Sequence, residues 1–333
     1  ADRWGILPTM ATGAGLIALG LVAAGWAGSF PVLIALMILA GVGYGLLNPT
    51  STKAVIAWFP PAQRATAVGL KQTGLPFGGA VGAAVLPLIA LAVGWQNALI
   101  ASASGVALLG AATLFLYRDP ADLPRPSASA PAPSIASVLG NRDLWLVASA
   151  TLIFAAVQTV WMSFLVLYLK DVVGLAVVAA AWYLAAAQVT GMAGRVAFGL
   201  LSDRAFGGRR RIVLFLAGIG SGLCSLAMAE IGPGSSPWLL AAVALTFGFV
   251  GIGWNGVQHT LMAELAGPRA AGTAVGLGLA ISSLGVTLGP PAFGWLVERV
   301  GAYRLPWMSL AASMGLALVL LGFVREGRRR YDR

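Results

Sequence analysis

Long apolar runs alternate with short polar segments along the whole chain. A helix needs about 20 consecutive apolar residues to cross the hydrocarbon core of a bilayer, and glycine, proline and charged residues mark the ends of these runs. The pattern therefore predicts ten membrane-spanning helices. Their expected ranges are 7–28, 31–58, 65–92, 95–117, 144–169, 175–201, 211–230, 237–265, 270–298 and 303–324.

One polar stretch, residues 118–143, is much longer than the others and is rich in proline, serine and alanine. Such a composition buries too little apolar surface to fold alone, so we interpret it as a linker on the cytoplasmic side. It divides the chain into an N-terminal helical bundle over 1–117, with four spans, and a C-terminal bundle with a basic tail over 144–333, with six spans.

The composition supports a membrane protein. Of the 333 residues 59% are hydrophobic and 10% are charged, whereas soluble domains contain about 25% charged residues. This excludes a soluble enzyme. The formal net charge of +10 lies in short clusters between apolar runs, with no polar domain to carry it, so we expect no nucleic-acid binding. The single cysteine, Cys224, is expected to be a packing residue.

The arginines are distributed asymmetrically. If the linker is cytoplasmic and the spans alternate in direction, the cytoplasmic segments carry fifteen arginines. The opposite side carries only Lys170, Arg299 and Arg304. This bias obeys the positive-inside rule and supports the count of spans, because one missed helix would disrupt it. We expect a multi-pass protein of a bacterial inner membrane.

The chain contains an internal repeat. The sequence of residues 66–70 recurs at 273–277, and four further identities share its offset. These further pairs are Gly41 with Gly248, Asn48 with Asn255, Gly78 with Gly285, and Gly82 with Gly289. Duplicated halves around a central site are common in secondary transporters.

Two loop segments resemble a known family. Residues 199–210 read GLLSDRAFGGRR, and residues 1–5 read ADRWG. Both resemble the G-x-x-x-D-R-x-G-R-R loop of the major facilitator superfamily, which follows helix 2 and again helix 8. The resemblance implies a conformational or gating role for five loop residues. These are Asp2, Arg3, Gly199, Asp203 and Arg204.

The resemblance also implies a fold. It predicts an all-α membrane protein with two bundles, in which the ten spans are helices 3–12 of twelve and the sequence begins after helix 2. The linker then falls between helices 6 and 7. A family of exporters with ten spans by nature is the alternative, but it would divide the spans five and five rather than four and six.

Arg195 is the first candidate for substrate binding. It lies eight residues before Asp203 within a span, where a guanidinium must face a cavity, a carboxylate or carbonyl groups. Its fork of N–H donors matches planar anions. The resemblance implies that an arginine at this position contacts the substrate in nitrate- and monocarboxylate-type members. The alternative is an arginine that braces neighbouring helices.

Lys71 is a second candidate. It shares a helical face with Gly74, Gly78 and Gly82, a spacing that also suits close helix packing.

His259 is the only histidine, and it can bind substrate or carry a proton. The alternative is a buried histidine whose hydrogen bonds are satisfied by its neighbours. Further polar or aromatic candidates lie on the spans that border the central cavity in this family. They are Asn48, Thr52, Gln158, Trp161, Asn255 and Gln258.

None of the acidic residues falls in the middle of a span, whereas exporters of cationic drugs usually need a buried carboxylate. We therefore expect a permease that moves a small anion by alternating access, and a symporter of the anion with protons is one form of such a permease. Multidrug efflux is the alternative among transporters, and a non-transporting receptor or assembly protein is the alternative of another class. We expect no cofactor, no metal and a monomer.

Overall fold

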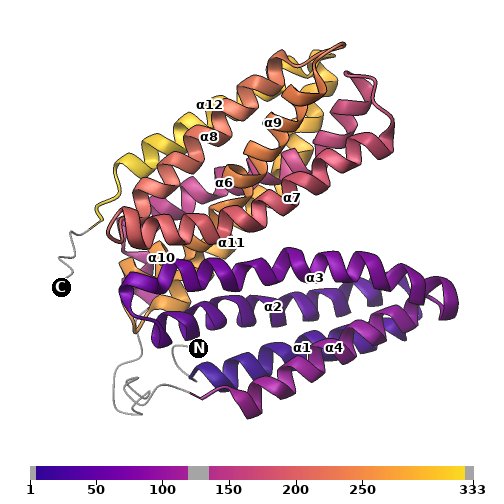
Figure 1. Cartoon of the computed structure of the whole chain (residues 1–333). Helices are drawn as coiled ribbons and strands as arrows, with labels where there is room; N and C mark the ends of the chain where they lie inside the picture. The colour runs from indigo at the N-terminus through magenta and orange to yellow at the C-terminus, as the bar shows by residue number, and fades with distance from the viewer. Residues whose placement is uncertain (1–4, 119–134, 327–333) are drawn as a thin grey trace. The chain divides into compact units, whose positions relative to one another are not determined.

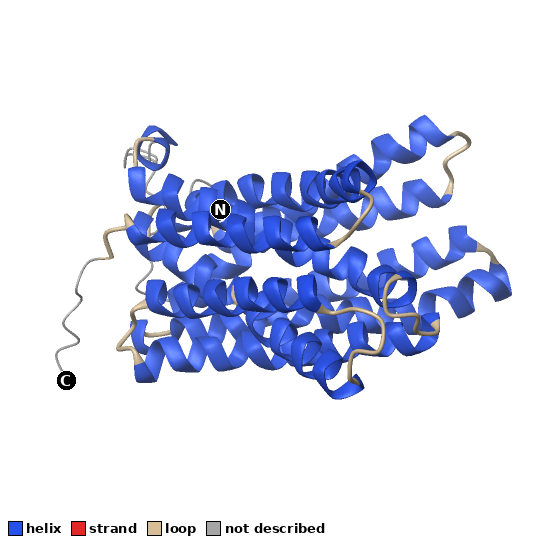
Figure 2. Ribbon diagram, turned by 90° about the horizontal axis from the view of Figure 1, so that it is seen from above, coloured by secondary structure: helices blue, strands red, loops and turns tan. Residues whose placement is uncertain are grey.

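All regular structure in the described residues is helical (Figures 1 and 2). The computed structural model describes residues 5–118 and 135–326, and it leaves the side chains at 79, 80, 83, 84, 87, 88, 91, 177 and 178 undescribed. Each of the ten predicted spans coincides with a helical segment. Within the described part, nine helices are long and apolar enough to cross a membrane.

The main helices follow one another in chain order. They are α1 (Ile6–Gly25), α2 (Phe30–Trp58), α3 (Arg64–Val93), α4 (Trp95–Leu116), α6 (Arg142–Asp171), α7 (Val177–Leu200), α8 (Arg210–Glu230), α9 (Pro237–Phe247), α10 (Asn255–Ala266), α11 (Ala271–Val300) and α12 (Arg304–Gly322). The short ones are η1 (Pro61–Gln63), α5 (Ile135–Leu139), η2 (Leu201–Ala205) and η3 (Gly248–Ile252).

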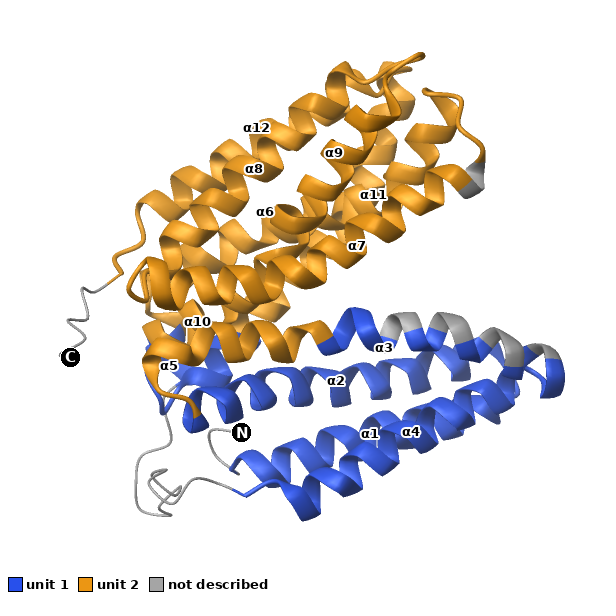
Figure 3. Cartoon of the chain, in the orientation of Figure 1, with its two compact units in different colours: residues 1–58, 74–138, 266–276 blue, residues 59–73, 139–265, 277–333 orange. Residues whose placement is uncertain are grey.

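The described residues form two compact units (Figure 3). Unit 1 comprises residues 1–58, 74–138 and 266–276. Inside it, α1 packs against α2 and α4. The α1–α2 contact is close because each helix places a glycine there: a Cβ on Gly13 would lie 2.9 Å from the carbonyl oxygen of Gly43.

Unit 2 comprises residues 59–73, 139–265 and 277–333, so it includes the beginning of α3. Its centre is an aromatic cluster between α6, α9 and α12. The indole of Trp161 stacks on Phe247 with 3.8 Å between ring centroids and meets Trp307 edge-on. Tyr168 packs against the same Trp307, and its hydroxyl shares its one proton between the carbonyls of Met228 and Ile231.

The outward faces of the long helices are apolar. Trp238, Phe115 and Leu116 are more than 80% exposed, and many other large apolar side chains are exposed on both units. In water an apolar surface this extensive would drive association, whereas in a bilayer it faces hydrocarbon. The same composition that excludes a soluble fold therefore builds a surface suited to lipid.

The arginine-rich segments of unit 2 lie at one end of that unit. The carboxylate of Glu326, after α12, bonds the first residues of α8, and the backbone N–H of Arg325 donates to Asp143 at the start of α6. The opposite ends of these helices carry the Lys170–Asp171 and Arg304–Glu230 ion pairs. This arrangement agrees with the charge asymmetry read from the sequence.

The predicted span 237–265 contains an irregularity that the apolar pattern did not reveal. A π-helical turn, η3, separates α9 from α10. Such a turn frees backbone carbonyls and often marks a functional site. Here the carbonyl of Gly251 accepts from the indole of Trp254, and that of Ile252 accepts from Asn255 and Arg195.

Helix α7 packs closely on η3 through glycines. A Cβ on Gly194 would collide with the backbone carbonyl of Phe249, and a backbone group cannot rotate away as a side chain can. We expect Gly194→Val to lower the free energy of unfolding by about 1–3 kcal/mol or more, as overpacking does. Thermal unfolding in detergent measures this.

Gly315→Ala, in α12, is the matched control. A Cβ at Gly315 would meet nothing within 4 Å, so alanine should be neutral or raise the stability by about 0.5–1 kcal/mol through its better helix propensity. Equal unfolding temperatures for Gly194→Val and the parent protein would contradict the close approach of α7 and η3.

Candidate functional site

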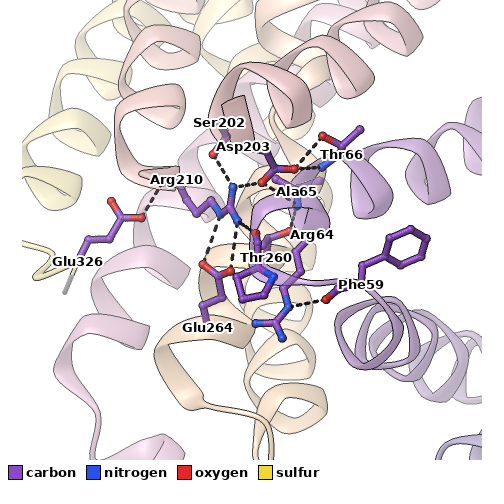
Figure 4. A network of polar contacts seen from close by, with 12 residues as sticks. Phe59, Arg64, Ala65, Thr66, Ser202, Asp203, Arg210, Thr260, Glu264 and Glu326 are labelled. Carbon is purple, nitrogen blue, oxygen red and sulfur yellow. Dashed lines mark hydrogen bonds and ion pairs between the residues drawn. The ribbon is translucent and has the colours of Figure 1, made fainter. Parts of the chain in front are cut away.

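Two groups of interacting polar and charged side chains, buried or half-buried, stand out in the described part of unit 2. The first, which we call the end network, comprises Thr66, Asp203, Arg210, Glu264 and Glu326 and lies at the arginine-rich end of the unit (Figure 4). The second, which we call the basic cluster, lies further along the helices. It comprises Lys71, Gln72, Arg195 and His259.

Asp203 caps the N-terminus of α3 (Figure 4). One carboxylate oxygen accepts from the backbone N–H and the hydroxyl of Thr66, at 2.8 and 2.7 Å, and the other faces the N–H of Ala65 at 3.4 Å. The first N–H groups of a helix lack partners within it and carry the positive end of its dipole. A carboxylate placed there satisfies both, so Asp203 ties the loop after α7 to α3.

Arg210 is completely buried and connects the other members of the network. Its guanidinium donates to Asp203, to the hydroxyl of Ser202 and to the carbonyl of Pro61. It also forms two bonds of 3.3 Å with the carboxylate of Glu264 on α10. Two carboxylates offset the desolvation of one buried cation, which is the condition for keeping a charge inside a protein.

Glu326, after α12, bonds the first backbone N–H groups of α8, and Arg211, at the start of α8, bonds a backbone carbonyl after α12. The carboxylate of Glu326 accepts from the backbone N–H groups of Arg210 and Arg211 at 2.6 and 3.2 Å, and the guanidinium of Arg211 donates to the carbonyl of Val324 at 2.6 Å. Burial raises the pKa of the Glu326 carboxyl, and the two backbone N–H groups oppose that rise. The segment after α12 is thus fixed to α8.

The predicted gating residues have different surroundings. Gly199 lies against the start of α3, where a Cβ would collide with the backbone of Ala65 and Thr66. Asp203 is buried in the end network, and Arg204 is exposed. Asp2 and Arg3 lie outside the described residues. Among the described loop residues, the structure therefore brings Gly199 and Asp203 to the same helix end.

Arg195 is 4% exposed, and its guanidinium reaches two backbone carbonyls. Nη1 donates to Gln72 on α3, and Nε donates to Ile252 at 3.3 Å, in the π-helical turn. The side chain thereby connects three helical segments. This is the bracing arrangement that the sequence left open, and it also holds a buried positive charge at a fixed place.

His259 and Gln72 are hydrogen-bonded. The ring nitrogen Nδ1 of His259 lies 2.7 Å from the side-chain amide nitrogen of Gln72, and both residues are buried. Lys71 is half-buried beside them and, like Arg195, interacts electrostatically with His259. The structure therefore brings together three of the residues singled out from the sequence, namely Lys71, Arg195 and His259.

Three further candidates, Gln158, Asn255 and Gln258, lie on α6 and α10. The amide of Asn255 donates to Gln158 on α6 at 3.2 Å. Gln258 is 2% exposed, and its amide nitrogen lacks a hydrogen-bond partner in the described part of the chain. It faces Gly278 on α11, where a Cβ would lie 2.8 Å from that nitrogen. The α10 residues Asn255, Gln258 and His259 thus contact three different helices, α6, α11 and α3 respectively.

Trp161 is a core residue of unit 2. It is 1% exposed, stacks on Phe247 and donates its indole N–H to the hydroxyl of Ser225 at 3.1 Å. In unit 1, Asn48 donates to the hydroxyl of Tyr44 at 3.2 Å, and the hydroxyl of Thr52 donates to the carbonyl of Asn48. Tyr44, Asn48 and Thr52 are thus linked by hydrogen bonds along α2.

The sequence pattern did not mark Gln72, Glu264 or the central role of Arg210. Gln72 follows Lys71 directly inside an apolar run, and a buried amide is as noteworthy there as a lysine. Glu264 lies close to a helix end, where a carboxylate is ordinarily solvated, so nothing in the sequence marked it. Among the described residues, no group of three or more His, Cys, Asp or Glu side chains is arranged to hold a metal ion.

Long apolar helices that also contain buried charged groups are typical of membrane proteins that transport solutes. Charges inside a bilayer mark pathways for solutes or ions, and the helices carry them at fixed depths. The described part of the chain is therefore a polytopic membrane protein of the solute-transporter type.

Comparisons with known proteins give the family. The profile of the Major Facilitator Superfamily matches residues 1–290, and the chain belongs to this family of membrane transporters. It is 32% identical over 325 residues to an uncharacterised MFS-type transporter of Mycobacterium tuberculosis, covering 97% of this chain and 71% of that protein. The expectation of a transporter rather than an enzyme is confirmed.

One further relative and one solved structure are also similar to the chain. A probable sulfoacetate transporter of Cupriavidus necator is 28% identical over 350 residues, covering 97% of this chain and 79% of the relative. The crystal structure of the transporter FucP in its outward conformation matches with a TM-score of 0.78 at 18% identity, covering 98% of this chain and 85% of that one. The latter likeness supports the fold alone.

Proposed function

We propose that this transporter moves a small anion across a bacterial inner membrane by alternating access. The observation that carries the proposal is the basic cluster, in which Lys71, Arg195 and His259 lie together inside unit 2. Buried cations are stable where an anion or carbonyl dipoles compensate them. A substrate anion fits such a place, and a cationic drug does not.

The position of the acids favours the same substrate class. Every acidic residue described within a helix is among the first or last three residues of its helical segment. These residues are Asp143, Asp171, Asp203, Glu230, Glu264 and Glu298. Asp203, which is buried, and Glu264, which is half-buried, both bond Arg210. The named sulfoacetate transporter among the relatives, which carries an organic anion in its name, supports the proposal further.

The end network supports alternating access. Asp203 bonds the start of α3, and Arg210 bonds the carbonyl of Pro61 just before it. A transporter must break and remake contacts at one end of its helices during each cycle. We propose that the loop containing Gly199, Asp203 and Arg204 acts as this releasable contact.

Ligand-induced stabilisation of the full-length protein tests the substrate class. A ligand that binds only the folded state stabilises it by about 2.7 kcal/mol at 100 times its Kd. We expect sulfoacetate or another small carboxylate to raise the unfolding temperature in detergent, and we expect Arg195→Ala to abolish that shift. Arg209→Ala, an exposed arginine outside the basic cluster, is the control and should retain it.

Two results would contradict the proposal. Stabilisation by cationic drugs and not by anions would favour multidrug efflux. An equal shift in Arg195→Ala and in the parent protein would remove Arg195 from the binding site.

A further inference from the structure

The hydrogen bond between Gln72 and His259 determines where the imidazole carries its proton. The amide nitrogen of a glutamine can only donate, and this nitrogen lies 2.7 Å from Nδ1 of His259. With the amide in this orientation, Nδ1 is the acceptor and carries no proton. In a neutral imidazole the single ring proton is then on Nε2.

The charges around the ring agree with the neutral form. In the described part of the chain, the charged groups that interact electrostatically with His259 are Lys71 on α3 and Arg195 on α7, and both are cations. They supply no charge that would hold an imidazolium in place. The backbone of Gln72 is itself fixed, because its carbonyl accepts from Nη1 of Arg195.

The position of the ring proton matters for an anion. An anion offers only acceptors, so a ring nitrogen that binds it must carry a proton. The tautomer with the proton on Nε2 makes that nitrogen a donor, as the guanidinium of Arg195 and the ammonium of Lys71 already are. The opposite tautomer would offer a lone pair at Nε2 and repel the anion.

We infer that Gln72 is a positioning residue, which holds His259 as a neutral imidazole protonated on Nε2 and so makes this nitrogen a hydrogen-bond donor for the transported anion. The role of the donor rests on the proposed function. The tautomer does not, and it can be measured without any transport.

Nuclear magnetic resonance of ¹⁵N,¹³C-histidine-labelled full-length protein reads the tautomer directly. His259 is the only histidine of these 333 residues, and the spectrum of His259→Gln identifies its signals. The two neutral tautomers and the imidazolium have different ring shifts. We expect the parent protein at neutral pH to show an unprotonated Nδ1 and a protonated Nε2.

Two variants of Gln72 should change that signature in different ways. Gln72→Met keeps the length of the side chain but removes the donor, so a mixture of tautomers is expected. Gln72→Glu replaces the donor by an acceptor, so Nδ1 should become protonated. Gln63→Met, which replaces an exposed glutamine in η1, is the matched control and should leave the spectrum unchanged.

The outcomes separate the two proposals. A protonated Nδ1 in the parent protein, or an unchanged ring signature in Gln72→Glu, would overturn the inference about Gln72, whatever the protein transports. If the tautomers follow the expectation, Gln72→Glu should also raise the KM for the anion at least tenfold. Expected tautomers with an unaltered KM would overturn the role of Nε2 as the donor.

Discussion

Arg210→Met is expected to destabilise the protein more than any other single change in unit 2. The substitution keeps an unbranched apolar stem but leaves Asp203 and Glu264 without the cation that they share. Breaking a buried ion pair by removing one partner costs about 3–5 kcal/mol, because the remaining charge stays buried. We expect the unfolding temperature to fall by about 10 °C, which differential scanning fluorimetry in detergent measures.

A neighbouring arginine and a compensated variant provide the controls. Arg209 is exposed, and Arg209→Met should change the unfolding temperature by about 1 °C or less, as surface substitutions do. Adding Asp203→Asn and Glu264→Gln to Arg210→Met removes the uncompensated charges, so part of the loss should be recovered. An additive, still larger loss in this triple variant would show that the charges are not the cause.

Arg195→Ala is expected to reduce anion transport steeply at low substrate concentration while the protein remains folded in the membrane. Removing a buried charged partner of a ligand costs about 2–5 kcal/mol of binding free energy, which corresponds to roughly 30-fold or more in affinity. Arg195→Lys keeps the charge but loses the fork that reaches both Gln72 and Ile252. Lysine should therefore restore part of the affinity at most.

Two measurements, the unfolding temperature and the KM for the anion, distinguish a bracing role of Arg195 from an anion-binding role. If the guanidinium only braces α3, α7 and η3, both variants should lower the unfolding temperature without changing the KM of the remaining transport. If it binds the anion, the KM rises steeply in Arg195→Ala and less in Arg195→Lys. Unchanged KM values in both variants would exclude an anion contact.

The sequence predicted the membrane helices well because each depends on its own composition. A run of about 20 apolar residues has few alternatives to a spanning helix, and a glycine or proline marks its end. The charge asymmetry follows from the same local patterns, whereas most of the predicted linker, residues 119–134, lies outside the described residues. The π-helical turn at 248–252 escaped this reasoning, because an inserted residue changes the backbone without changing hydropathy.

The candidate site was predicted only in part. Arg195 and His259 stood out because a charged or titratable group is rare in an apolar run. Their partners did not, since Gln72 belongs to a helix far away in the sequence and backbone carbonyls leave no mark in it. Trp161 illustrates the converse: an aromatic residue on a predicted cavity helix packs in the core, because side-chain direction depends on how α6 turns toward α9.

Substrate flux into proteoliposomes tests the central claim most directly. The full-length protein should exchange labelled sulfoacetate or a labelled monocarboxylate against the same unlabelled anion inside, with saturation, and cationic drugs should not compete. Exchange no faster than in protein-free liposomes for every small anion, together with uptake of a cationic drug, would contradict the account.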